Sequence, residues 1–514
     1  MSSKQSAGII RRFLFLSLLA LLVGCGGGGG SGGDVPGFAN RMITAFSFTA
    51  AANPQLGADL AGTINEADGT ILLAGPLDVD DVAGLKASFT TTGKEVSVGG
   101  VVQESGVTEN SFAGPLTYRV TAEDGSTRDY TVCVAYWKHP SGLTDNISSD
   151  GDAYDPQSAM DDSGNALIVW RQSDGSSYQI FKSEYRDGIW THPEGPDDNI
   201  SPDVQHANPP QSAMDNSGNA LIVWMQSDGS TQQIYKSEYR DGVWTDPEDL
   251  DDHISPGGQH AYNPQVAMDD NGNALIVWPQ SDGSNYQVFK SEYRDGEWTH
   301  PTDLFNSISP DAGSANSPQV AMDDNGNALI VWPQSDGSNY QVFKSEYRDG
   351  AWIHPATLSG YINPNGEDVY DPQVAMDNSG NAVIVWQQSD GSTQQIYKSE
   401  YRDGAWTHPE DLDDNISQNG QDAEEPQAAM DGSGNAVIVW EQSDGSNWQI
   451  FKSEYRDGVW THPEDLDDHI SQNGQDAYPS QVAMDDSGNA VIVWNQPDGI
   501  NWQIFKSEYR FWEE

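Results

Sequence analysis

"NPQVAMDDNGNALIVWPQSDGSNYQVFKSEYRDGEWTHP", residues 263–301, decides the fold because strand and turn signals alternate along it. Apolar, β-branched and aromatic runs favour strands at 264–269, 274–280, 286–294 and 297–301, and Asn-Gly or Asp-Gly turns separate them. Apolar residues do not recur every 3.6 positions, which argues against helices. Four short antiparallel strands joined by tight turns are typical of one β-propeller blade.

The same unit recurs at a fixed period of 54 residues, marked by the tyrosines Tyr185, Tyr239, Tyr293, Tyr347, Tyr401, Tyr455 and Tyr509. A period near 50 is typical of propellers and other repeat arrays. The last copy stops after its third strand, whereas an unmatched "WKHP" strand at 137–140 precedes the first copy. We therefore predict an all-β, seven-bladed propeller over 137–514, in which 137–140 supplies the fourth strand of the last blade.

The two motifs "D-x-x-G-N-A-x-x-V-W" and "S-E-Y-R-D-G-x-W" resemble the blades of sialidase-like propellers with Asp-box repeats. The resemblance implies a propeller, although Ser237 and Asp241 lie four positions apart where the box has them two apart. Sialidases use three arginines that converge on a carboxylate. From residue 140 onward only Arg171 lies outside the repeated "SEYR", so sialidase chemistry is not expected.

The N-terminal part contains a targeting signal and a small domain. Lys4, Arg11 and Arg12 precede an apolar run, and "LVGC" at 22–25 follows it. This arrangement resembles bacterial lipoproteins and implies a signal peptide at 1–24, a lipidated Cys25, a Gly-rich linker at 25–40 and an outer-membrane anchor. Short strands with Asp-Gly turns over 41–136 predict a β-sandwich that resembles Ig-like modules.

The composition limits the partners. The formal net charge of −54 disfavours nucleic acid, because the phosphate backbone is also negative. It fits a solvated surface or a surface that binds cations. We expect a monomer that meets the membrane only through its lipid.

Strand direction predicts two unlike faces. The first-to-second and third-to-fourth turns share a face that is nearly identical in every copy, the framework face. The second-to-third turn and the blade-to-blade loop share the other, the varied face, whose sequence differs from copy to copy. On the third strand, Lys236, Glu238 and Arg240 alternate outward and are expected to pair across strands.

The varied face holds the candidate ligand-binding residues, because loops on a rigid framework usually carry function. Aromatic rings with neighbouring carboxylates and amides suit a sugar, although packing at blade edges would explain the rings equally well. The candidates are Arg171, Tyr178, Tyr262, Tyr286, Tyr340, Tyr370, Glu441, Trp448, Tyr478 and Trp502.

Metal sites and catalytic residues are not predicted. A histidine before proline recurs in most copies, but on outer strands of different blades these side chains lie too far apart to share an ion. "DDNGN" and "SDGSN" contain the oxygen ligands of calcium, yet they lack the spacing of an EF-hand loop and read as tight turns. We therefore expect no cofactor, with calcium as the weak alternative.

Three functions remain open from the sequence. The first is a membrane-anchored lipoprotein, periplasmic or surface-exposed, that binds a glycan or a surface protein on the varied face. The second is a polysaccharide-active hydrolase or lyase, because carboxylates are numerous enough to pair. The third is a structural spacer.

Overall fold

The computed structural model describes residues 41–509 apart from 57, 74–81, 135–145, 150, 162, 187, 204, 365, 457, 486–487 and 498–501. The described residues form strands and no helix. They divide into two compact units. No described helix is therefore long and apolar enough to cross a membrane.

The N-terminal unit is a β-sandwich. One sheet has the order β2-β1-β6, a second has the order β3-β4-β11-β10-β7-β8, and β5 pairs with β9. A single core cluster joins the two larger sheets, with Phe46 of β1 against Tyr118 of β10 (ring centroids 5.1 Å apart). The strands are β1 (Ile43–Phe48), β2 (Leu60–Ala61), β3 (Thr63–Asn65), β4 (Thr70–Leu73), β5 (Leu85–Lys86), β6 (Ser88–Thr91), β7 (Glu95–Val98), β8 (Val101–Val102), β9 (Glu109–Asn110), β10 (Leu116–Thr121) and β11 (Thr127–Val134).

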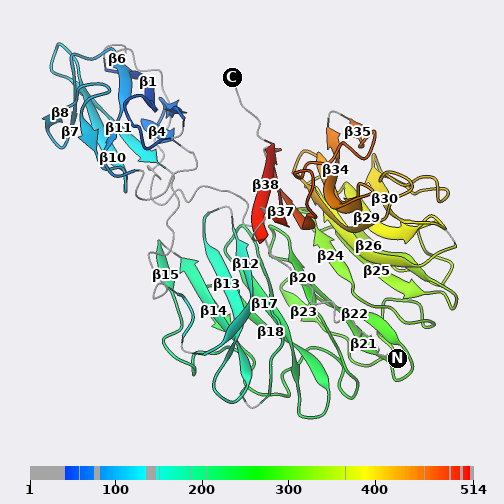
Figure 1. Ribbon diagram of the computed structural model, residues 1–514. Coiled ribbons are helices and arrows are strands. Elements are labelled where there is room, and N and C mark those ends of the chain that lie inside the picture. Colours follow the sequence, from blue (N-terminus) through cyan, green and yellow to red (C-terminus); the bar gives the residue numbers. More distant parts are fainter. Residues whose placement is uncertain are drawn as a thin grey trace. The chain divides into compact units, whose positions relative to one another are not determined.

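Seven antiparallel sheets follow, six with four strands and the last with three (Figure 1). The predicted all-β, seven-bladed propeller is confirmed. The innermost strands are β12 (Ala153–Met160), β16 (Gln211–Met214), β20 (Gln265–Met268), β24 (Gln319–Met322), β28 (Val369–Met376), β32 (Ala423–Met430) and β36 (Tyr478–Met484). The expected closing strand at 137–140 lies outside the described residues.

The second strands are the most buried, as their continuous apolar runs require. They are β13 (Ala166–Ser173), β17 (Ala220–Ser227), β21 (Ala274–Ser281), β25 (Ala328–Ser335), β29 (Ala382–Ser389), β33 (Ala436–Ser443) and β37 (Ala490–Pro497).

The third and fourth strands complete each blade. The third strands are β14 (Tyr178–Arg186), β18 (Gln232–Arg240), β22 (Tyr286–Arg294), β26 (Tyr340–Arg348), β30 (Gln394–Arg402), β34 (Trp448–Arg456) and β38 (Trp502–Tyr509). The fourth strands are β15 (Ile189–Thr191), β19 (Val243–Thr245), β23 (Glu297–Thr299), β27 (Ala351–Ile353), β31 (Ala405–Thr407) and β35 (Val459–Thr461).

The propeller core consists of separate clusters, each shared by two neighbouring blades. In one of them, Leu221, Val223 and Ile234 of the second blade pack against Ile276 and Trp278 of the third, and all five are fully buried. Burial of a large apolar side chain contributes roughly 1.5–3 kcal/mol. Hydrophobic contact between blades, repeated around the ring, therefore stabilises the propeller.

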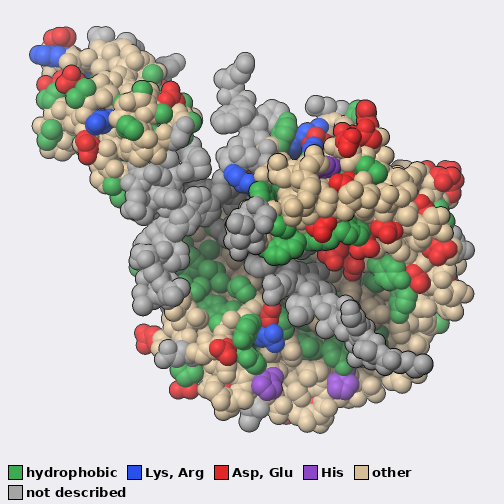
Figure 2. Space-filling view, viewed as in Figure 1, with side chains coloured by type: hydrophobic (Ala, Val, Ile, Leu, Met, Phe, Trp, Pro, Cys, Tyr) green, Lys and Arg blue, Asp and Glu red, His purple; other side chains and the backbone are tan. Residues whose placement is uncertain are grey.

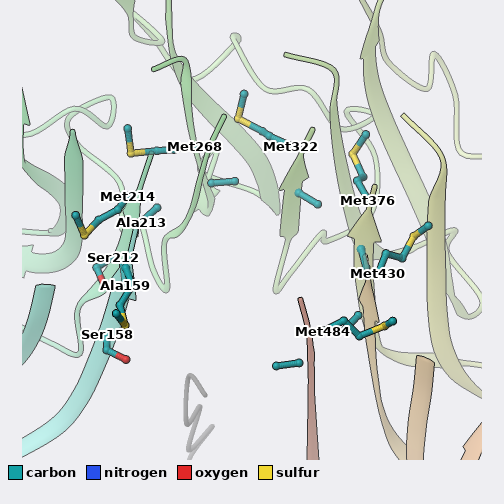
Figure 3. A pocket seen from close by; sticks show the side chains of 16 residues that line it. Ser158, Ala159, Ser212, Ala213, Met214, Met268, Met322, Met376, Met430 and Met484 are labelled. Atoms are coloured by element: carbon teal, nitrogen blue, oxygen red, sulfur yellow. The ribbon is translucent and has the colours of Figure 1, made fainter. Parts of the chain in front are cut away.

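The seven innermost strands border one central cavity of about 490 Å³. Each contributes an Ala-Met pair, and Figure 3 shows the methionines of successive strands around the opening. Because all seven copies line the same cavity, the blades are arranged around a common axis, as in a propeller.

The charged residues of the third strand do not pair as predicted. Lys236 Nζ lies 3.3 Å from Glu238 Oε2 on the same strand, so the pair runs along the strand rather than across it. The Lys236 ammonium also lies 4.7 Å from the ring centre of Trp298 in the next blade, and the Trp298 indole N–H donates to Glu238 Oε2 (2.7 Å). The prediction failed because the strand faces the next blade, whose aromatic side chains form the closer partners.

The arginine extends this contact to the next blade. The Arg240 guanidinium lies 3.7 Å from the ring centre of Tyr293. Lysine, glutamate and arginine of one blade together with tryptophan and tyrosine of the next form what we call the junction latch. Cation–π contacts of this kind contribute roughly 0.5–2 kcal/mol. The repeated "KSEYRDG-x-W" is thus an inter-blade connector.

We expect Glu238→Ala to destabilise the propeller by about 1–2 kcal/mol, because it removes the acceptor shared by Lys236 and Trp298. Urea unfolding followed by tryptophan fluorescence measures this, since residues 41–134 contain no tryptophan and the probe reports the propeller alone. The matched control is Glu297→Ala, which changes an exposed glutamate of β23. Equal stability of the two variants would contradict a role for the latch.

Candidate functional site

The two loop types predicted to share the varied face are held together by buried polar contacts. In the gap between the first two blades, the Ser201 hydroxyl in the blade-to-blade loop donates to Gln179 Oε1 (2.5 Å), and the Ile180 N–H donates to Ser201 Oγ (3.0 Å). Gln226 Nε2 in the next blade donates to the Pro202 and Gln205 carbonyls (2.6 and 2.9 Å). The prediction of a shared face is confirmed, and equivalent bonds position the loops at the other junctions.

In the first six blades, the residue that opens the third strand is fixed by the following blade-to-blade loop. The Tyr340 N–H donates to Asp368 Oδ1 (2.7 Å) and the Trp448 N–H donates to Asp476 Oδ1 (2.9 Å). The backbone of this residue is therefore fixed in the same way from blade to blade, although the side chain at this position differs between copies.

The structure brings the candidate aromatic residues together in separate groups. Tyr262 lies against Tyr286, with ring centroids 5.8 Å apart. Tyr370 and Tyr340 both lie beside Asp368. Burial, followed by the Asp368 charge, raises the pKa of Tyr370. The candidates thus do not converge on one point, which differs from the arrangement of a single catalytic centre.

The largest group lies at the last blades. Tyr478 stands between Trp448 and Trp502, with ring centroids 6.2 Å from each. Trp502 keeps 59% of its surface exposed. An exposed tryptophan with a tyrosine beside it forms an accessible aromatic surface.

Arg171 is engaged within its own blade. Its Nε lies 2.6 Å from Asp155 Oδ2. Its guanidinium lies 5.4 Å from the ring centre of Tyr178 and 6.0 Å from that of Tyr154. Tyr154 and Tyr178 are themselves 5.9 Å apart. This blade therefore presents two tyrosines around a neutralised cation.

Glu441 occupies the position equivalent to Arg171 in the sixth blade, but its surroundings are acidic. It is 5% exposed and lies directly opposite Glu424 in the antiparallel pair of β32 and β33. Burial, followed by the charges of Glu425 and Glu424, holds the pKa of Glu441 well above its ordinary value. Figure 2 shows acidic side chains gathered on the blades that carry β29, β30 and β35.

The sequence reasoning missed several residues of this face. Tyr154, Glu424 and Glu425 lie at the start of innermost strands, where a register shift interrupts the pairing with the second strand. Glu425 has a left-handed backbone (φ 52°). Comparison of the copies could have found Tyr154 and Glu424, because they occupy the same repeat position as Tyr262, Tyr370 and Tyr478.

Phe305 was also missed. It is 93% exposed and borders a cavity of about 610 Å³ on the loop between the third and fourth blades. Comparison of the copies could have found it, because four other copies have aspartate at this position, Asp197, Asp251, Asp413 and Asp467.

The recurrent histidines and Asp-rich turns have structural partners. His300 Nδ1 lies 2.9 Å from Ser291 Oγ, and burial lowers the pKa of His300 to about 4. In the "DDNGN" turn, Asp269 Oδ1 accepts the N–H groups of Asn271 and Asn273 (3.0 and 2.8 Å). Within the described residues, no three His, Cys, Asp or Glu side chains are placed to hold a metal ion.

The two cysteines of the sequence bear on the anchor. Cys133, which lies in β11, is disulfide-bonded. Cys25 lies outside the described residues. Because the sequence contains only these two cysteines, one molecule cannot keep that bond within its own chain and also carry a lipid on the Cys25 sulfur. Lipidation of Cys25 stays a prediction.

The N-terminal domain matches a known family. Residues 43–134 match the family described as SGBP, N-terminal. No curated protein matches the sequence.

Solved structures of low similarity match part of the chain. An ulvan lyase, described as a new family of polysaccharide lyase, is 10% identical, with a TM-score of 0.43 over 70% of this chain and 94% of its own. The polysaccharide lyase Uly1 is 9% identical, with a TM-score of 0.38 over 72% of this chain and 91% of its own. An endo-arabinase from Bacteroides thetaiotaomicron is 14% identical, with a TM-score of 0.29 over 49% of this chain and 94% of its own. At these similarities no residue role is transferred.

Proposed function

We propose that the protein is a cell-surface glycan-binding protein whose propeller holds a polysaccharide on the varied face. The observation that carries the proposal is the cluster of Trp448, Tyr478 and the exposed Trp502. Sugar rings have apolar C–H faces that pack on aromatic rings, and their hydroxyls bond to nearby carboxylates and amides.

The N-terminal domain supports the same function independently. The SGBP family is one of glycan-binding surface proteins, and residues 43–134 match its N-terminal model. In this proposal the Gly-rich segment at 26–33 is a flexible tether, and lipid on Cys25 anchors the protein to the outer membrane, which requires that Cys25 is not paired with Cys133.

The test is a glycan array with the purified protein, followed by calorimetry of each hit with Trp448→Ala, Tyr478→Ala and Trp502→Ala. We expect each substitution to weaken binding by roughly 5- to 10-fold, because an aromatic contact contributes about 1 kcal/mol. Trp190→Ala is the matched control, since this partly exposed tryptophan lies in β15, away from the varied face.

Other outcomes separate the alternatives. Unchanged affinity in all three variants would show that the glycan binds elsewhere on the protein. If the protein binds another protein and no glycan, its ligand is a surface protein. If it binds neither, the structural-spacer function is the one that remains.

A second candidate is a polysaccharide hydrolase that uses Glu424 and Glu441, which face each other across β32 and β33. Directly opposed strand residues are about 5 Å apart, close to the separation of paired carboxyls in retaining glycosidases. Acid–base pairs, however, have pKa values pushed apart, whereas the pKa values of Glu424, Glu425 and Glu441 are all raised. Release of reducing ends that Glu424→Gln abolishes would nevertheless establish the enzyme.

A further inference from the structure

The gap between the sixth and seventh blades contains a nearly buried glutamate that has no partner among the described residues. Glu441 is 5% exposed, no described residue donates a hydrogen bond to its side chain, and its oxygens keep a small contact with solvent. No described lysine or arginine forms an ion pair with Glu441, Glu424 or Glu425. A buried polar group without a partner costs several kcal/mol if charged, and such groups in native proteins call for a functional explanation.

The other copies show that the fold does not require a carboxyl group here. The equivalent residues of the second to fifth and seventh blades are uncharged, and only Arg171 of the first blade is charged, with Asp155 as its counter-ion. The uncharged equivalents are Met225, Pro279, Pro333, Gln387 and Asn495. The acid at position 441 therefore has a role apart from folding.

The charged groups that face Glu441 are all acidic. Glu424 lies opposite it on β32, and Glu425 follows at the register shift. Farther carboxylates act on these two: Asp422 and Asp371 contribute to raising the pKa of Glu424, and Asp371 that of Glu425. On the next blade, the charges of Asp476, Glu441 and Glu424, after burial, raise the pKa of Tyr478, so these acids lie near its ring.

Aromatic rings complete the gap. Trp448 shares a sheet face with Glu441, because Ile450 pairs with Glu441 and residues two apart on a strand point to the same side. Tyr478 lies across the gap from Trp448, and Trp502 beyond it is open to solvent. Ring faces and carboxylates both attract a cation, and an ammonium group supplies three hydrogen-bond donors.

We propose that this gap binds the ammonium group of an amino-sugar unit, with Glu441 and Glu424 as its acceptors and Trp448, Tyr478 and Trp502 as the surrounding rings. The assignment rests on the proposed glycan-binding function. A neutral sugar would leave the acidic group without a counter-ion, and a uronate or sulfated sugar would be repelled by it.

The experiment is calorimetry of the full-length protein at about pH 6, where amines carry their charge. A β-1,4-linked glucosamine hexamer is compared with the N-acetylated hexamer, which has the same rings and no charge, and with trilysine, which has amines and no sugar. We expect the glucosamine hexamer to bind at least tenfold more tightly than either.

Glu441→Gln is expected to reduce binding of the glucosamine hexamer to the level of the N-acetylated hexamer and to leave the latter unchanged. The fold tolerates glutamine here, since Gln387 is the equivalent residue of the fifth blade. Glu297→Gln removes the same charge from an exposed site on β23 and should change nothing.

Equal affinity for the two hexamers would overturn this assignment and leave the glycan-binding function intact, whereas failure on every glycan overturns both. A preference that survives Glu441→Gln would also overturn it. Trilysine binding as tight as the glucosamine hexamer would show that the gap selects an amine regardless of sugar, and the assignment to an amino sugar would then be wrong.

Discussion

Glu441→Gln is expected to stabilise the unliganded propeller at neutral pH. Burial and the neighbouring charges of Glu425 and Glu424 hold the pKa of Glu441 well above its ordinary value, so the folded protein either keeps a proton that the unfolded chain has lost or bears an unpaired buried charge. Each unit of such a shift corresponds to about 1.4 kcal/mol. Glutamine has nearly the same shape and no charge, and we expect a gain of at least about 1 kcal/mol at pH 8.

The direction of the pH dependence provides a second readout. Below the ordinary pKa of glutamate the carboxyl is protonated in both states, and Glu441 adds no pH dependence. Above that value the unfolded chain releases the proton first, so stability falls as pH rises until the raised folded pKa is passed. The Glu441→Gln variant should lose the contribution of Glu441 to the pH dependence of the free energy of unfolding. The contributions of Glu424 and Glu425 remain, because their pKa values are also raised.

Urea unfolding at several pH values between 4 and 8 measures both effects, with Glu297→Gln as the control that removes an exposed charge. A variant that is less stable than the parent at pH 8 would contradict the account. It would mean that the carboxyl group forms a favourable interaction in the folded state.

Trp278→Ala is expected to cause the largest loss of stability, about 3–5 kcal/mol. Trp278 is fully buried in the cluster between the second and third blades, where it packs with Ile276 and Phe289. Its indole N–H also donates to Gln280 Oε1 (3.1 Å), and the same glutamine donates from Nε2 to the Pro256 carbonyl, to which it lies 2.5 Å away. The substitution therefore leaves a large cavity and weakens the hold on a loop of the varied face.

Urea unfolding gives the magnitude, and Trp190→Ala gives the comparison, since Trp190 is 39% exposed and should cost less than about 1 kcal/mol. A matching effect of the two substitutions would show that the inter-blade clusters do not dominate stability. A further loss of glycan affinity in Trp278→Ala would show that the buried amide network positions the loops.

The sequence was sufficient for the fold because local and global signals agree. The seven copies of the 54-residue unit give the number of blades. The turns of residues 263–301 predicted strands that match β20, β21, β22 and β23 closely. Strand direction also placed the turns on the correct faces. These features follow from residues that are near each other in the chain.

Contacts between blades could not be predicted from these local patterns. Lys236 and Trp298 are 62 positions apart, and no local pattern shows that the ammonium group lies over that ring. Glu424 and Glu441 looked unremarkable as two of 78 acidic residues, and only the pairing of β32 with β33 shows that they share a buried gap. The grouping of the candidate aromatic residues could not be predicted either, because it depends on which blade each ring leans toward.

The junction latch makes the blades interchangeable parts. From the first blade to the sixth, each boundary uses the same lysine, glutamate and arginine against the same tryptophan and tyrosine, so the chemistry of these boundaries is the same from blade to blade. Exchanging the sixth blade for the first would place Arg171, with its counter-ion Asp155, where Glu441 stands and would remove the acidic character of the gap. Single blades can therefore be exchanged by engineering to change which ligand the varied face binds.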